Sequence, residues 1–220
     1  MKRKQSAYNV CILTPGASGT WPRTMLKHMF PALETKAKLY LPSNKIGTRI
    51  NTKTLDAFEQ RVVEICTQEK GNKVFLVSQS FGARISAHYL SQTVPDNTKG
   101  EWTRKHDIPK NLLGSIYLGY PFFKQGQDRS IPLKKLPSNI QSLFISGSSD
   151  PFAKGLVTQL EHMDAQINIV EKGKHNVFDP PTNEESRKQI LEQIQAFVSN
   201  QASNKRPKTV SSANACQHIH

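Results

Sequence analysis

The sequence has no long hydrophobic run and few cysteines, and both absences narrow the class of protein. No apolar stretch approaches the ~20 residues that a membrane-spanning helix needs. The apolar run 10–13, which follows a basic start, is too short for a signal peptide and ends at a Thr-Pro-Gly turn. The three cysteines are odd in number and lack metal-site spacing. We therefore expect a cytoplasmic protein with no membrane span, no disulfide framework and no metal.

Acidic residues are scarce relative to basic ones. The chain holds 30 Lys and Arg against 17 Asp and Glu, a net charge of +13. Such a charge attracts nucleic acid, acidic lipid headgroups or anionic substrates. The sequence has no zinc finger and no aromatic ribonucleoprotein strand, so we favour a solvated basic surface over a nucleic-acid site. The basic segment 204–208 faintly resembles a nuclear localisation patch but is too short to count as one, so we expect the cytoplasm, with the nucleus as the alternative.

Segments typical of strands alternate with segments typical of helices along most of the chain. This alternation predicts an α/β fold with a mainly parallel sheet of about six strands flanked by helices. The polar segment 93–111 is interpreted as a loop excursion, which leaves no large lid. We expect one domain over 1–199 and a disordered basic tail over 200–220. Strands are expected near 8–14, 37–42, 73–79, 112–119, 140–147 and 166–172, and helices near 20–33, 52–70, 81–92, 153–164 and 182–199.

A candidate nucleophile follows the third expected strand. Ser80 stands between Ser78 and Gly82 at the point where a helix is expected to begin. The pattern Ser-x-Ser-x-Gly is a variant of the Gly-x-Ser-x-Gly turn that carries the nucleophile of α/β-hydrolases. That turn needs small residues on either side, because strand and helix pack closely there. The alternative is an ordinary serine in a strand-to-helix loop.

The acid and the base that a catalytic serine needs follow in the chain order of this fold. Asp150 stands in a Gly/Ser/Pro loop after an apolar strand, at the sheet edge where doubly wound folds place their chemistry. His175 follows the last expected strand. The competing interpretations are a helix-capping aspartate and a solvated surface histidine.

An oxyanion hole would complete the site, because backbone N–H groups must stabilise the charge on the substrate oxygen. One donor in this fold is the residue after the nucleophile, here Phe81. The second comes from a loop after an earlier strand, and the Gly-rich loop 14–19 offers the Ala17 N–H. The alternative for this loop is a simple turn into the first helix.

Five segments of the sequence resemble a small α/β-hydrolase-like family. This family includes testis-expressed protein 30 and the hydrolase-like domain of a subunit of the NSL histone acetyltransferase complex, and dienelactone hydrolases are more distantly similar. Two departures are Pro15, where the family has His before the oxyanion Gly, and Ser78, where it has Gly before the nucleophile. The resemblance spans about residues 8–199 and rests on segments 15–19, 80–84, 119–121, 144–150 and 171–175.

The sequence thus predicts a serine hydrolase that cleaves a small ester or thioester through an acyl-enzyme on Ser80, with Asp150 and His175 completing a catalytic triad. Its partner would be a small-molecule acyl substrate, and no cofactor is implied. The resemblance also implies an alternative, because the chromatin-complex relatives act as interaction modules. The rival hypothesis is therefore a non-catalytic α/β-hydrolase-like interaction protein.

Overall fold

A computed structural model describes residues 7–41, 49–95, 101–124, 127–161 and 163–200. Asn200 ends the last helix, and the rest of the predicted tail, 201–220, lies outside the described residues. Part of the predicted loop excursion, 96–100, also lies outside them.

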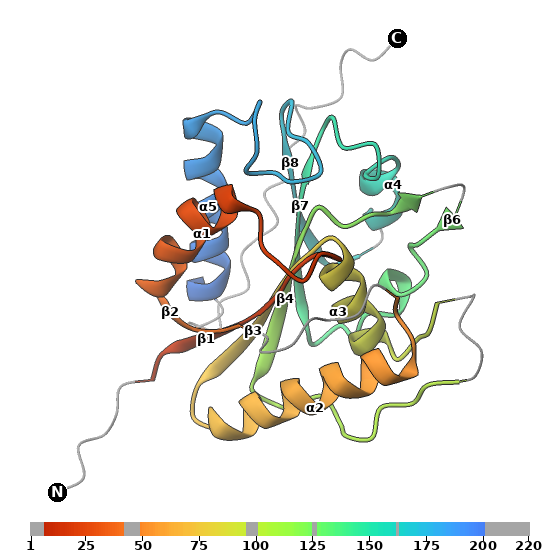
Figure 1. The fold of residues 1–220 in the computed structure, drawn as a ribbon. Coiled ribbons are helices and arrows are strands. Elements are labelled where there is room, and N and C mark those ends of the chain that lie inside the picture. Colours follow the sequence, from red (N-terminus) through yellow and green to blue (C-terminus); the bar gives the residue numbers. More distant parts are fainter. Residues whose placement is uncertain (1–6, 42–48, 96–100, 125–126, 162, 201–220) are drawn as a thin grey trace, which may run out of the picture.

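The centre of the fold is a six-stranded, wholly parallel sheet with the strand order β2-β1-β3-β4-β7-β8 (Figure 1). Each strand coincides closely with one that the sequence predicts. Strands buried on both faces read as near-continuous apolar runs, which is why they were visible in the sequence. The bounds are β1 Asn9–Thr14, β2 Ala37–Tyr40, β3 Lys73–Gln79, β4 Leu112–Leu118, β7 Gln141–Gly147 and β8 Ala165–Val170.

Helices cover both faces of the sheet (Figure 1). α1 (Arg23–Glu34) and α5 (Glu184–Asn200) lie on one face, and α2 (Thr52–Gln68) and α3 (Phe81–Ser91) lie on the other. The fourth helix, α4 (Leu156–Leu160), is shorter than the predicted 153–164. No helix in the described part of the chain is long and apolar enough to cross a membrane.

Two small elements between β4 and β7 were not predicted. A two-stranded antiparallel hairpin pairs β5 (Phe123–Lys124) with β6 (Gln127–Asp128), and the 3₁₀ turn η1 (Leu133–Lys135) follows it. Strands of two residues carry too little periodicity for a sequence pattern to detect.

The described end of the predicted loop excursion packs on α2. The Trp102 side chain is buried, and its Nε1 donates to Asp56 Oδ1 at 3.1 Å. The backbone N–H of His106 donates to Glu59 Oε1 at 2.7 Å. These hydrogen bonds attach the described end of the loop to α2.

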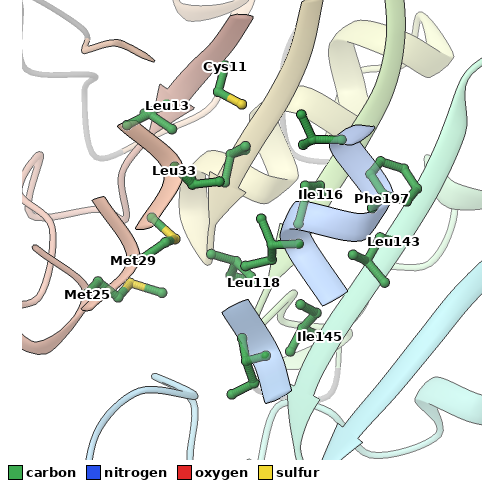
Figure 2. Packing of buried hydrophobic residues seen from close by; sticks show 14 of the residues in the cluster. Cys11, Leu13, Met25, Met29, Leu33, Ile116, Leu118, Leu143, Ile145 and Phe197 are labelled. Carbon is green, nitrogen blue, oxygen red and sulfur yellow. The ribbon is translucent and has the colours of Figure 1, made fainter. Parts of the chain in front are cut away.

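Alternate residues of each strand face opposite layers of the core. Cys11 and Leu13 of β1 pack with α1 and α5 (Figure 2), whereas Val10 and Ile12 pack with α2 and α3. The same alternation holds along β3, as expected for side chains that point to alternate faces of a sheet. The two layers together hold the carboxyl ends of the strands in register.

We expect truncation of Phe197 in α5 to destabilise the protein strongly. Phe197 is 2% exposed, and its ring packs edge-on against Phe75 with 6.2 Å between the ring centroids. Phe197→Ala should lower the free energy of unfolding by ~3–5 kcal/mol, because it removes a fully buried ring and leaves a cavity. Gln193→Ala on the exposed face of the same helix is the matched control and should change it by less than ~0.5 kcal/mol. Urea denaturation measures both, and equal effects would contradict this packing.

Candidate active site

Ser80 occupies a sharp turn between a strand and a helix. β3 ends at Gln79, α3 begins at Phe81, and Ser80 between them has φ 50° and ψ −108°. A positive φ is unfavourable for a residue with a Cβ, and it persists only where the surroundings enforce it. The backbone of Ser80 is therefore strained in the way that the sequence pattern predicts for a nucleophile turn.

The two small residues that flank Ser80 in the motif, Ser78 and Gly82, have different structural roles. A Cβ on Gly82 would lie 2.5 Å from the carbonyl oxygens of both Thr14 and Pro15, so only glycine lets α3 approach the end of β1 this closely. Ser78 is fully buried, and its Oγ lies 2.6 Å from Ser86 Oγ, one of the two donating to the other. Ser78, which departs from the family pattern, thus uses its hydroxyl to join β3 to α3.

Ser80, His175 and Asp150 form a continuous hydrogen-bonded chain. His175 Nε2 lies 2.7 Å from Ser80 Oγ, and His175 Nδ1 lies 2.8 Å from Asp150 Oδ2. Because a carboxylate only accepts, Nδ1–H donates to Asp150 and Nε2 accepts from the serine hydroxyl. The three residues come from the ends of three different strands, β3, β7 and β8.

The surroundings of Asp150 fix its carboxylate and keep it from water. Its side chain has no exposed area, against 28% for the side chain of His175. The second carboxylate oxygen, Oδ1, accepts from the backbone N–H of Phe152 at 2.9 Å. The Phe152 ring meets the imidazole of His175 edge-on, with 5.0 Å between centroids. Both oxygens of Asp150 therefore have partners, and an aromatic ring packs against one side of His175.

The loop that carries His175 is anchored to α1. Asn176 Nδ2 donates to Thr24 Oγ1 at 3.3 Å, and Thr24 Oγ1 donates to the Asp179 carboxylate through a short hydrogen bond. From α5, Arg187 Nε donates to the Phe178 carbonyl at 2.9 Å. These contacts hold the loop from two helices on one face of the sheet, so they act on the position of His175.

The backbone N–H groups of Phe81 and Ala17, the two predicted oxyanion donors, have no acceptor among the described residues. For Phe81 this is expected, because the N–H groups in the first turn of a helix have no acceptor within the helix. Phe81 is the first residue of α3, directly after Ser80. Ala17 is exposed and follows Gly16, where a Cβ would lie 3.8 Å from Ser80 Cβ. The loop 14–19 thus runs beside the serine.

The other described histidines lie outside this chain of hydrogen bonds. His28 faces Glu184 across the α1–α5 side, and His106 contacts Glu59 on α2. Burial, with a smaller contribution from the charge of Arg84, lowers the pKa of His88 to about 4, so His88 is neutral at pH 7. The remaining histidines that the sequence offers, at 162, 218 and 220, lie outside the described residues.

Sequence reasoning missed the residues that support the triad. Phe152 was hidden in an unremarkable turn, although it follows Asp150 by two positions. The partner of Ser78 could have been found, because Ser86 lies about one and a half turns into α3, on the side that faces β3. Thr24 and Asn176 are 152 positions apart, and a pattern within one segment carries no signal for such a pair.

The chain belongs to the α/β-hydrolase domain family, whose sequence profile matches residues 34–203. The match includes Ser80, Asp150 and His175, and it begins after the loop 14–19 that carries Ala17. A comparison with curated proteins finds no match.

Solved structures share the fold at low sequence identity. Dienelactone hydrolase from Anabaena variabilis is 11% identical with a TM-score of 0.61, over 89% of this chain and 87% of that one. Est1E from Butyrivibrio proteoclasticus, solved with ferulic acid, is 11% identical with a TM-score of 0.61, over 91% and 92%. An uncharacterized protein from Bacillus cereus is 15% identical with a TM-score of 0.59, over 91% of this chain, which spans only 62% of that protein. At these identities the likeness concerns the fold, and the named activities belong to those proteins.

We expect Gly82→Ala to damage the strand-to-helix turn. The added methyl would overlap the carbonyl oxygens of Thr14 and Pro15, so α3 or the loop after β1 must move. Overpacking of this kind costs about 1–3 kcal/mol of unfolding free energy. Gly71→Ala is the matched control, because a Cβ there meets nothing within 4 Å. Thermal denaturation of both variants measures the difference, and an undisturbed Gly82→Ala protein would refute the close approach.

Proposed function

We propose that this protein is a serine hydrolase that cleaves a small ester or thioester through an acyl-enzyme. The observation that carries the proposal is the hydrogen-bonded chain from Ser80 Oγ through His175 to the buried Asp150. A nucleophile, a base within hydrogen-bond reach and a group that orients the base are the parts that acyl transfer needs.

In the acylation step, Ser80 Oγ attacks the carbonyl carbon of the substrate while His175 Nε2 takes the hydroxyl proton. Asp150 holds the ring through Nδ1 and stabilises the imidazolium that forms. The carbonyl oxygen becomes an oxyanion, which the N–H groups of Phe81 and Ala17 would bind. When the tetrahedral intermediate collapses, His175 returns the proton to the departing alcohol or thiol.

In the deacylation step, His175 activates a water molecule that attacks the acyl group on Ser80. The second tetrahedral intermediate collapses to the free acid and the regenerated serine. Each step uses the same three side chains, and no metal or organic cofactor takes part.

Three further features support the proposal of a cytoplasmic serine hydrolase with Ser80 as its nucleophile. The strained backbone of Ser80 is typical of a nucleophile turn. The motif resemblance to the small family of testis-expressed protein 30 extends over the nucleophile, acid and base segments. Two of the cysteines, Cys11 and Cys66, are buried free thiols, which suits the cytoplasmic location that we propose.

A fluorophosphonate probe tests the nucleophile directly. We expect the probe to attach to Ser80, because its hydroxyl alone among the nearby serines is hydrogen-bonded to His175. Peptide mass spectrometry locates the adduct. Ser80→Ala should abolish labelling, and Ser91→Ala, at the far end of α3, should retain it. An adduct on Ser78 or Ser86 would refute this mechanism, and a folded protein that takes no label would favour the interaction-protein alternative.

The role of Asp150 predicts a large loss of turnover with little loss of structure. Asp150→Asn keeps the shape of the side chain but cannot hold His175 in the tautomer that accepts from Ser80. We expect kcat for a p-nitrophenyl ester to fall by ~10⁴-fold, which is the loss found when the aspartate of a Ser-His-Asp triad is replaced by asparagine. The circular dichroism spectrum should be unchanged. A fall of less than ~10-fold would show that His175 does not depend on Asp150.

A further inference from the structure

Two partly buried arginines near the triad have no acidic partner among the described residues. Arg84 lies on α3, and Arg129 follows β6. Neither side chain makes an ion pair or a hydrogen bond with a described residue, and the Nε of each is buried without an acceptor. Arginine is charged at all physiological pH values, so two positive charges stand here without a counter-charge from the part of the chain that the structure describes.

The packing of α3 brings the two arginines into one neighbourhood. Ala83 of α3 lies in the same buried cluster as Tyr120 and Phe122 of the segment after β4. The Tyr120 hydroxyl donates to the backbone carbonyl of Arg129 at 2.8 Å. Burial lowers the pKa of Arg84 to about 10, and the positive charge of Arg129 adds to this effect. The two guanidinium groups are thus close enough to repel one another, and Tyr120 lies near both.

The same neighbourhood adjoins the triad. The backbone N–H of Arg84 donates to the Ser80 carbonyl at 3.2 Å, one helical turn from the nucleophile. Side chains in a helix lean toward its N-terminus, which here is the Ser80 end. From the other side, the N–H of Phe123 donates to the carbonyl of Phe152, whose ring lies against His175. The backbone of Arg84 thus lies one helical turn from Ser80, and the hairpin that precedes Arg129 is bonded to the turn of Phe152.

The nearby titratable groups do not neutralise this pair. The closest acid in sequence, Asp128, is exposed and accepts from the Ser130 N–H instead. Burial raises the pKa of the Tyr120 hydroxyl, and burial lowers that of His88, so both are neutral at pH 7. Unpaired charges that have lost water are costly, and an anion placed between them removes that cost. Guanidinium groups match carboxylate and phosphate geometry through paired hydrogen bonds.

We propose that Arg84 and Arg129 bind an anionic group, a carboxylate or a phosphate, on the substrate that Ser80 attacks. The inference rests on the proposed hydrolase function and adds the substrate class: an ester or thioester with a negative charge on the portion that lies along α3. Two arginines in one neighbourhood select for charge at this place, whereas the triad alone accepts any reactive acyl group.

Anion binding is measured first without catalysis. In the Ser80→Ala protein, we expect adipate or inorganic phosphate to raise the melting temperature at constant ionic strength, whereas chloride does not. The anion that raises the melting temperature, adipate or phosphate, identifies the bound group of the substrate as a carboxylate or a phosphate. Arg84→Gln in the same background should remove the shift. Arg104→Gln is the matched control, because Arg104 contacts Tyr89 and Gln92 at the opposite end of α3 and should retain it. If neither anion gives an arginine-dependent shift, the proposal is wrong.

Selectivity in turnover is measured second, with two esters of equal length. If adipate is the stabilising anion, the p-nitrophenyl monoester of adipic acid is compared with p-nitrophenyl hexanoate; if phosphate is, the first ester carries a terminal phosphate. We expect Arg84→Gln to lower the ratio of the two kcat/KM values by ~10-fold or more, the value of a hydrogen bond to a charged group. Arg84→Lys, which keeps the charge, should restore part of the ratio. A ratio that Arg84→Gln leaves unchanged would overturn the proposal.

The two proposals fail separately. Fluorophosphonate labelling needs no anionic group, so a labelled Ser80 without any anion effect removes the arginine site alone. An arginine-dependent thermal shift in a protein that takes no label removes the hydrolase function and leaves an anion-binding site.

Discussion

The close approach of backbone to backbone at the carboxyl edge of the sheet is the constraint on which the site depends. A Cβ on Gly82 would strike the end of β1, one on Gly119 would strike the His175 carbonyl, and one on Gly147 would strike the Gly173 carbonyl. These contacts bring the ends of β3, β4, β7 and β8 near enough for Ser80, His175 and Asp150 to meet. The same packing maintains the strained backbone of Ser80, because β3 before it and α3 after it are both packed into the hydrophobic core.

Support for the triad is distributed over both faces of the sheet. On one face, α1 and α5 hold the loop after His175 through Thr24 and Arg187. On the other, α3 is joined to β3 through the buried Ser78–Ser86 pair. The aromatic cluster beyond β4 then brings Arg129 toward Arg84 and the turn of Phe152 toward His175. The fold thereby holds Ser80 and His175 in hydrogen-bond contact from both faces of the sheet.

The sequence predicted the sheet and the three side chains that the structure joins by hydrogen bonds, but it did not predict the contacts that support them. Continuous apolar runs such as that of β7 revealed the strands, and the chain order of Ser80, Asp150 and His175 matched one fold. The hairpin of β5 and β6 is too short to show a period. The Thr24–Asp179 bond joins residues 155 positions apart, and the Arg84–Arg129 neighbourhood depends on how Tyr120 packs. Such contacts arise from tertiary packing, which no local pattern encodes.

A crystal structure of the fluorophosphonate adduct would show how Ser80 and the oxyanion donors act together, because the phosphonyl group mimics the tetrahedral intermediate. We expect a covalent bond from phosphorus to Ser80 Oγ, with the phosphoryl oxygen about 2.7–3.1 Å from the N–H groups of both Phe81 and Ala17. His175 would remain bonded to Asp150 and face the leaving-group side. An adduct whose phosphoryl oxygen faces solvent, with neither N–H in reach, would show that Phe81 and Ala17 do not form an oxyanion hole.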